Sequence, residues 1–143
     1  MYNGETVVQI KADADIVTAR QQGRALAVEI GFSSSEQALI ATAISEAARN
    51  ILQYAHNGEI LLDRIEDGGR EGILIIARDE GPGIKDIQLA LEDGYSSSGG
   101  LGLGLPGIKR LVSEMDLKSA PGKGTTLTIK KWKMWNGHAE QND

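Results

Sequence analysis

Residues 72–83 read Gly-Ile-Leu-Ile-Ile-Ala-Arg-Asp-Glu-Gly-Pro-Gly, and this stretch decides the fold of the chain. Its apolar run, residues 73–77, predicts a central strand that is buried on both faces of a sheet. Asp79 follows this strand at a sheet edge, where its carboxylate can accept a hydrogen bond from an exocyclic amine such as that of adenine. Gly81 and Gly83 would let the backbone approach such a base closely, whereas the alternative is an ordinary turn after a strand.

A long helix is predicted before this strand. Ser33 begins a Ser-Ser-Ser-Glu sequence that matches a capping box, with Glu36 three residues after the cap. Farther along, Glu46 and Asn50 are one helical turn apart and therefore point into the same volume. An amide oxygen is a suitable ligand for Mg²⁺, and a carboxylate beside it can orient or deprotonate a nucleophile. Taken alone, the same pair also fits a solvated polar helix face.

Glycine is concentrated after the strand, where it accounts for six of residues 94–107. Gly100, Gly102 and Gly104 precede a helix that we expect over residues 105–114. Exposed amide N–H groups and a helix N-terminus suit a triphosphate, and a flexible glycine loop is the alternative. The cluster is not a P-loop, because no Gly-Lys-Ser/Thr follows, and it is not a dinucleotide fingerprint, because no suitable strand precedes it.

The remaining patterns complete an α+β order of elements, for which we expect a mixed sheet covered on one face by helices. Asp13 or Asp15 can cap a first helix, and Gly31 fits the left-handed residue that ends it. A turn at residues 121–124 leads into the last strand and would place Thr125 near the nucleobase. The predicted strands are residues 6–11, 59–65, 72–78, 117–120 and 125–133, with a turn at residues 66–69 between the second and the third.

Composition limits the class of protein. The 143 residues fit one domain, which we expect over residues 1–135, with a polar tail over residues 136–143. The absence of cysteine excludes disulfides, thiolate metal sites and cysteine nucleophiles. A net charge of -5 argues against a nucleic-acid partner, although residues 130–133 are locally basic. The N-terminus lacks a signal-peptide pattern and no apolar run approaches the roughly 20 residues of a membrane span, so we expect a cytoplasmic protein without a membrane partner.

The order and spacing of four motifs resemble those of the GHKL ATPase superfamily, which includes histidine kinase catalytic domains, DNA gyrase B, Hsp90 and MutL. The resemblance covers nearly the whole chain. It implies the Bergerat fold, a two-layer sandwich with a mixed sheet, helices on one face and a glycine-rich ATP lid that includes residues 84–98. The matching residues are Glu46 and Asn50 (N box), Asp79, Gly81 and Gly83 (G1 box), Gly100, Gly102 and Gly104 (G2 box), and Gly122, Gly124 and Thr125 (last glycine box).

Within this superfamily, the chain is most similar to bacterial serine/threonine kinases of anti-sigma-factor type, and among these to the stressosome switch kinases. The pieces that carry this likeness are residues 15–24, 43–51, 92–102 and 104–107. Anti-sigma factors of the superfamily often carry histidine four residues after the N-box asparagine, where this chain has Tyr54. The likeness implies ATP-dependent phosphorylation of a serine or threonine on a STAS-domain protein of the stressosome. The released kinase would then activate a PP2C-type phosphatase.

The same resemblance implies a role for each site residue. Asp79 would recognise adenine with support from Thr125, and Asn50 would hold Mg²⁺ against the phosphates of ATP. Amides of the G2-box glycines would cradle those phosphates. Glu46 would act as the general base toward the substrate hydroxyl.

Two alternative functions and the role of one helix face stay open at this point. An anti-sigma factor with kinase activity that sequesters a sigma factor is a second function that the motifs allow, and an ATP-gated interaction module with little catalysis is a third. Arg20 and Arg24, one turn apart on the first predicted helix, fit either a face that docks a partner or an ordinary solvated face.

Overall fold

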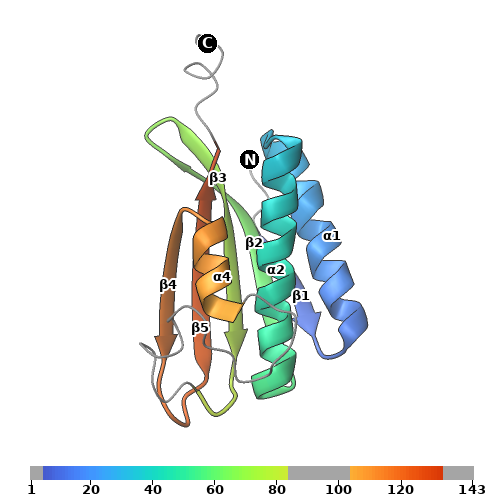
Figure 1. Cartoon of the computed structure of the whole chain (residues 1–143), viewed down its shortest axis with the longest axis vertical. Coiled ribbons are helices and arrows are strands. Elements are labelled where there is room, and N and C mark those ends of the chain that lie inside the picture. Colours follow the sequence, from blue (N-terminus) through green and yellow to red (C-terminus); the bar gives the residue numbers. More distant parts are fainter. Residues whose placement is uncertain (1–4, 84–103, 134–143) are drawn as a thin grey trace.

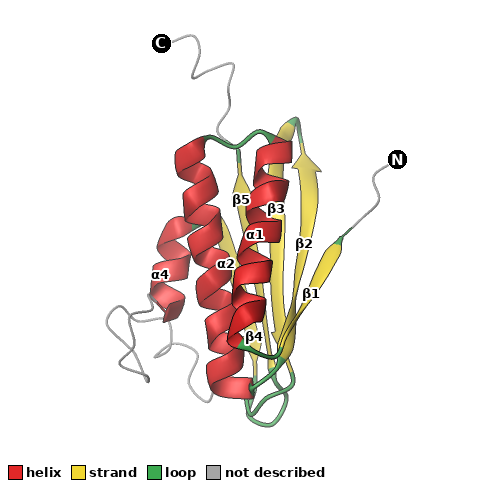
Figure 2. Ribbon diagram, turned by 90° about the vertical axis from the view of Figure 1, so that its right-hand side faces the viewer, coloured by secondary structure: helices red, strands yellow, loops and turns green. Residues whose placement is uncertain are grey.

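The computed structural model describes residues 5–83 and 104–133, which form an α+β sandwich of two layers (Figure 1). One layer is a five-stranded sheet in the order β1-β2-β3-β5-β4, and the described helices all cover one face of it (Figure 2). The predicted α+β class with helices on one face is therefore confirmed. The elements are β1 (Thr6–Ile10), α1 (Asp13–Ile30), α2 (Ser34–Ala55), β2 (Gly58–Asp67), β3 (Arg70–Asp79), α4 (Gly104–Leu111), β4 (Glu114–Ser119) and β5 (Thr125–Trp132).

The prediction of a mixed sheet is wrong for the described strands, because every pairing among them is antiparallel. Two consecutive helices separate β1 from β2 and form a hairpin, so the chain returns to run opposite to β1. β3 and β4 do point the same way, since both are antiparallel to β5. They are not neighbours, because β5 lies between them.

The start of α1 differs from the prediction in which residue is the cap. The N-cap is Ala12, whose side chain cannot accept a hydrogen bond, so Asp13 is not the cap. Asp15 instead acts from within the first turn, where its Oδ2 accepts from the backbone N–H of Lys11 at 2.8 Å and of Ala12 at 3.0 Å. A carboxylate in the first turn is also favoured by the helix dipole.

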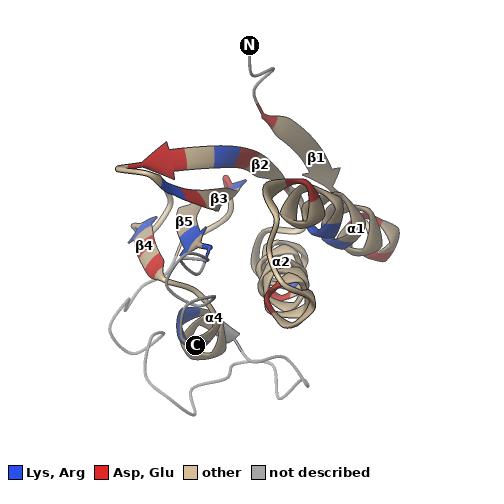
Figure 3. Ribbon diagram, turned by 90° about the horizontal axis from the view of Figure 1, so that it is seen from above, with Lys and Arg blue, Asp and Glu red and all other residues tan. Residues whose placement is uncertain are grey.

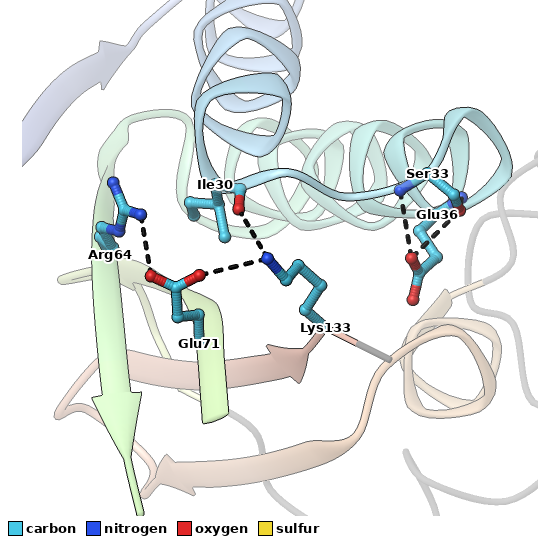
Figure 4. Close-up of polar contacts among 6 residues, drawn as sticks. All are labelled: Ile30, Ser33, Glu36, Arg64, Glu71 and Lys133. Atoms are coloured by element: carbon cyan, nitrogen blue, oxygen red, sulfur yellow. Dashed lines mark hydrogen bonds and ion pairs between the residues drawn. The ribbon is translucent and has the colours of Figure 1, made fainter. Parts of the chain in front are cut away.

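The junction between α1 and α2 follows the sequence prediction. Gly31 ends α1 in the left-handed conformation, with a φ of 104°. Ser33 then caps α2, because its Oγ accepts from the backbone N–H of Glu36 at 3.2 Å. The capping box is completed by Glu36 Oε1, which accepts from the backbone N–H of Ser33 at 3.2 Å (Figure 4).

The core lies between the helices and the sheet, and α2 is its central element. α2 packs against α1 on one side and α4 on the other, and it covers β2 and β3 (Figure 2). On β3, Ile73, Ile75 and Ala77 face the helices and are buried. Leu74 and Ile76 alternate with them and are only partly buried, because they lie on the face of the sheet that none of the described helices covers. The strand is central, as predicted, but burial on both faces was wrong.

Several predicted boundaries also shift. β2 and β3 continue to the two-residue turn at Gly68 and Gly69, which have φ values of 58° and 87° and suit a tight hairpin. The helix expected over residues 105–114 ends at Leu111, and β4 begins at Glu114 rather than at residue 117. The predicted tail, residues 136–143, and the predicted lid, residues 84–98, lie outside the described residues.

The last strand is tied to the C-terminal ends of two helices by lysines. Lys131 Nζ donates to the backbone carbonyl of Leu111 in α4 at 3.2 Å. Lys133, the residue after β5, donates from its Nζ to the backbone carbonyl of Ile30 in α1 at 3.1 Å, as Figure 4 shows. A cation is favourable at these ends because the terminal carbonyls lack partners within the helix. The locally basic segment noted in the sequence therefore has a structural use.

Glu71 connects Lys133 to the hairpin of β2 and β3. Its carboxylate accepts from Arg64 at 3.0 Å and from Lys133 at 3.2 Å (Figure 4). The hydrogen bond from Arg64, followed by that from Lys133, lowers the pKa of Glu71 below its ordinary value of 4.5. Elsewhere both acidic and basic residues occur on β2, β3 and β4 (Figure 3).

We expect Glu71→Gln to lower the free energy of unfolding by roughly 0.5–1 kcal/mol near neutral pH, because two partly exposed ion pairs are lost. A carboxyl group with a lowered pKa in the folded chain stabilises it above the unfolded value, and this contribution disappears as the pH falls through the folded value. The deficit should therefore shrink below pH 4.5. Urea unfolding of the wild type and the variant over a pH series measures this difference in the free energy of unfolding. Glu66→Gln, on the residue paired with Glu71 in β2, is the matched control. An equal loss in that control would contradict the assignment.

Candidate functional site

A row of polar residues crosses one end of the sheet. Ser119 is paired with Thr125, Thr125 with Asp79, and Asp79 with Gly58. Because side chains alternate along a strand, this row lies on the same face as the buried apolar residues that precede it, and therefore faces the helices. The next row inward is apolar and consists of Leu117, Leu127, Ala77 and Ile60. The arrangement gives an apolar wall bordered by hydrogen-bonding groups.

The Asp79 side chain is held by its own turn. Its Oδ1 accepts from the backbone N–H of Gly81 at 2.9 Å, and none of the described residues donates to Oδ2. Among the described residues, the second oxygen therefore has no donor, and it could accept from a group such as an exocyclic amine. A Cβ at Gly81 would lie 2.6 Å from the Cβ of Ala55 at the end of α2, so the turn needs glycine for packing as well. The backbone N–H of Gly122 donates to the carbonyl of Pro82 at 2.7 Å and joins this turn to the one before β5.

The two glycine turns interlock. Gly83 has a φ of 82°, and a Cβ there would collide with the backbone carbonyl of Ala120. Gly124 has a φ of 77°, and a Cβ there would collide with the backbone carbonyl of Asp79. Gly81 and Gly83 were predicted to allow the close approach of a ligand, and in the structure both positions also have a packing role within the protein itself.

Thr125 belongs to a hydroxyl pair that sequence reasoning missed. Its Oγ1 lies 2.8 Å from the Oγ of Ser119, and that Oγ also donates to the carbonyl of Gly124 at 2.9 Å. Ser119 falls inside a predicted strand, but only the pairing of β4 with β5 shows that it lies opposite Thr125. No local signal in the sequence marks it.

Glu46 and Asn50 lie on α2, whose last turns cover the end of this row. Ala55 packs against Gly81, as described above, and Asn50 is half-buried. Glu46 is only 9% exposed and forms an ion pair of 2.7 Å with Arg49. The alternative of a solvated polar face is therefore wrong for Glu46. A buried carboxylate is costly without partners, and the ion pair with Arg49 offsets part of that cost.

The donor groups fit a magnesium nucleotide. Mg²⁺ is commonly held through one or two protein oxygens together with substrate phosphates, and the amide oxygen of Asn50 is a ligand of that kind. Asp79 and the apolar wall suit an aminopurine base. Within residues 5–83 and 104–133, no group of three or more His, Asp or Glu residues could hold a metal ion. Gly104 is the first residue of α4, one residue before the predicted start of that helix, whereas Gly100 and Gly102 lie outside the described residues.

Comparison with known proteins identifies the family. Residues 35–134 match the family of histidine kinase-, DNA gyrase B- and HSP90-like ATPases. The chain is 52% identical to the serine/threonine-protein kinase RsbT of Bacillus subtilis (strain 168), over 91% of this chain and 98% of that protein. It is 30% identical to an anti-sigma F factor of Thermoanaerobacter sp. (strain X514), over 80% of this chain and 82% of that protein.

The chain therefore belongs to the histidine kinase-, DNA gyrase B- and HSP90-like ATPase family, which confirms the predicted superfamily and agrees with the predicted enzyme class. Among solved structures, it resembles the mycobacterial sensor histidine kinase MprB with a TM-score of 0.55 and 18% identity, over 90% of this chain and 97% of that one. At that identity the likeness concerns the fold alone. Of the helices in the described part of the chain, none is both long and apolar enough to cross a membrane.

The interlocked turns give a paired test. Gly122 and Gly124 have nearly equal φ values of 78° and 77°, but only a Cβ at Gly124 would meet another part of the chain. Gly122→Ala should cost about 1 kcal/mol of stability, through the left-handed backbone alone. Gly124→Ala should cost roughly 2 kcal/mol more, because the end of β3 at Asp79 must shift. Denaturant unfolding of both variants measures the two losses in stability. Equal losses would contradict the prediction that the collision at Gly124 adds to the cost.

Proposed function

We propose that the chain is an ATP-dependent serine/threonine protein kinase that phosphorylates a STAS-domain protein of the stressosome. Once released from that scaffold, it would activate a PP2C-type phosphatase in bacterial stress signalling in the cytoplasm. The observation that carries the proposal is the buried Glu46, one turn from Asn50, in a chain 52% identical to a serine/threonine kinase. Such a carboxylate can take the proton from a substrate hydroxyl during phosphotransfer.

Glu46 is proposed as the general base. The ordinary hydroxyl of serine or threonine is a weak nucleophile, and a positioned carboxylate that takes its proton contributes about 10²–10⁴-fold to the rate. The neighbouring Arg49 holds the Glu46 carboxylate at 2.7 Å and fixes its position on α2. The γ-phosphoryl group of ATP would pass to the substrate oxygen as its bond to the departing ADP breaks, while the proton of the hydroxyl passes to Glu46.

The nucleotide would lie over the polar row and the apolar wall. Asp79 and Thr125 would bind the adenine, and Asn50 would supply an oxygen to Mg²⁺, which neutralises charge on the phosphates when it is bound. Backbone amides of Gly100, Gly102 and Gly104 would cradle the phosphates, as the family motif implies. The packing role of Gly81 and Gly83 supports this assignment, since it keeps the Asp79 turn rigid.

A second candidate is an anti-sigma factor with kinase activity, which the 30% identity to an anti-sigma F factor favours. In that case the partner would be a sigma factor. Arg20 and Arg24 are exposed on α1 and are proposed as part of the face that docks a partner under either function. Incubation with labelled ATP and the STAS-domain proteins of the same genome, alongside a pull-down with its sigma factors, separates the two. Capture of a sigma factor without phosphorylation of a STAS protein would overturn the first proposal.

Glu46→Gln is expected to lower the rate of phosphotransfer by about 10²–10⁴-fold and to leave ATP affinity unchanged, because the amide keeps the shape but cannot take a proton. Glu29→Gln, an exposed site on α1, makes the same change of charge as a control. Single-turnover transfer and nucleotide titration measure the two quantities. Full transfer by Glu46→Gln would remove this residue from the mechanism.

Asn50→Ala is expected to weaken the binding of Mg-ATP by about tenfold or more, because the proposed magnesium ligand is lost. Gln53→Ala, at an exposed position of the next turn, serves as the matched control. Calorimetric titration with and without Mg²⁺ isolates the effect, which should vanish when the metal is removed. An unchanged affinity with Mg²⁺ would exclude Asn50 as a ligand.

A further inference from the structure

Ser119 lies at the end of the polar row, beside the proposed adenine site. As the last residue of β4, it is paired with Thr125, which is paired in turn with Asp79. Neighbouring side chains on one face of an antiparallel sheet have Cβ atoms about 4.5–5.5 Å apart, so the three polar groups form one continuous edge. A Cβ at Gly83 would lie 3.3 Å from the Ser119 Oγ, which places this hydroxyl against the G1-box turn.

The hydrogen bonds of Ser119 fix the direction of the Thr125 hydroxyl. Each hydroxyl has one proton to donate, and a backbone carbonyl can only accept. The contact of 2.9 Å between Ser119 Oγ and the carbonyl of Gly124 therefore uses the proton of Ser119. The contact of 2.8 Å between the two hydroxyls must then be completed by the proton of Thr125. Thr125 Oγ1 is left with lone pairs alone for any ligand.

The result is an edge that accepts hydrogen bonds but does not donate them. The Asp79 carboxylate is an acceptor, and its Oδ1 is already occupied by the N–H of Gly81. Thr125 becomes an acceptor through Ser119. At the C6 substituent, a 6-aminopurine presents N–H groups to such an edge, whereas a 6-oxopurine presents an oxygen that would face other acceptors without a proton between them.

We infer that Ser119 is a specificity-determining residue, which acts through Thr125 to make the site select a 6-aminopurine nucleotide over a 6-oxopurine nucleotide. The inference rests on the proposed function, in which the base of ATP lies beside Asp79. Ser119 itself is a positioning residue. Its effect is on the proton of Thr125, and through that proton on the choice of base.

The test compares Mg-ATP with Mg-ITP, which carries an oxygen in place of the amine at C6. Ser119→Ala frees the proton of Thr125, which can then be donated to that oxygen. The ratio of ATP affinity to ITP affinity should fall about tenfold, the change expected when one hydrogen-bond mismatch is relieved. Ser119→Thr should keep the ratio of the wild type. Thr126→Val, a hydroxyl on the opposite face of β5, should also leave it unchanged.

Two further variants separate this role from a structural one. Ser119→Cys keeps nearly the same volume with a weaker donor, so it should lower the ratio in the same direction. Because Ser119 acts through Thr125, Ser119→Ala combined with Thr125→Val should show the same ratio as Thr125→Val alone. An ATP to ITP ratio that stays at the wild-type value in Ser119→Ala and Ser119→Cys, with ATP binding intact, would overturn the inference. If the wild type binds no ATP, the proposed function fails first and the inference fails with it.

Discussion

The burial of α2 on three sides is the constraint on which the rest of the structure depends. Small residues on α1, namely Ala19, Gly23 and Ala27, allow this close packing, since a Cβ at Gly23 would collide with Ile44 of α2. A helix held so closely has few places for polar residues. Where α2 nevertheless carries a buried carboxylate, at Glu46, packing fixes its position as firmly as that of the apolar side chains around it.

The site also depends on the boundary between the apolar rows of the sheet and the polar row that ends them. Leu127 and Ala77 are buried, and two residues farther along each strand the same face carries Thr125 and Asp79. Hydrogen bonds in such surroundings are stronger and more directional than at a free surface. The two glycine turns hold this boundary in place by direct packing, so the motif glycines serve the geometry of the protein before they serve any ligand.

Local chemistry explains which features could be predicted from sequence. The left-handed Gly31 and the capping box at Ser33 depend only on neighbouring residues, and both were confirmed. Glu46 and Asp79 could be proposed as site residues because their motifs are also local. Strand direction, the open face at Leu74 and the pairing of Ser119 with Thr125 depend on residues far apart in the chain. No pattern within a single segment could have supplied them.

The place of β5 has a consequence for how the molecule is made. It is the last described strand in sequence but lies inside the sheet, between β3 and β4. While the ribosome is still synthesising residues 125–133, β3 has an unpaired edge and the carbonyl of Ile30 lacks its hydrogen bond from Lys133. The amino-terminal half therefore cannot close its sheet as it emerges, and folding must be completed after translation of the segment. A nascent chain stalled before this point would expose a long apolar strand edge, which is a hazard for aggregation and a natural target for chaperones.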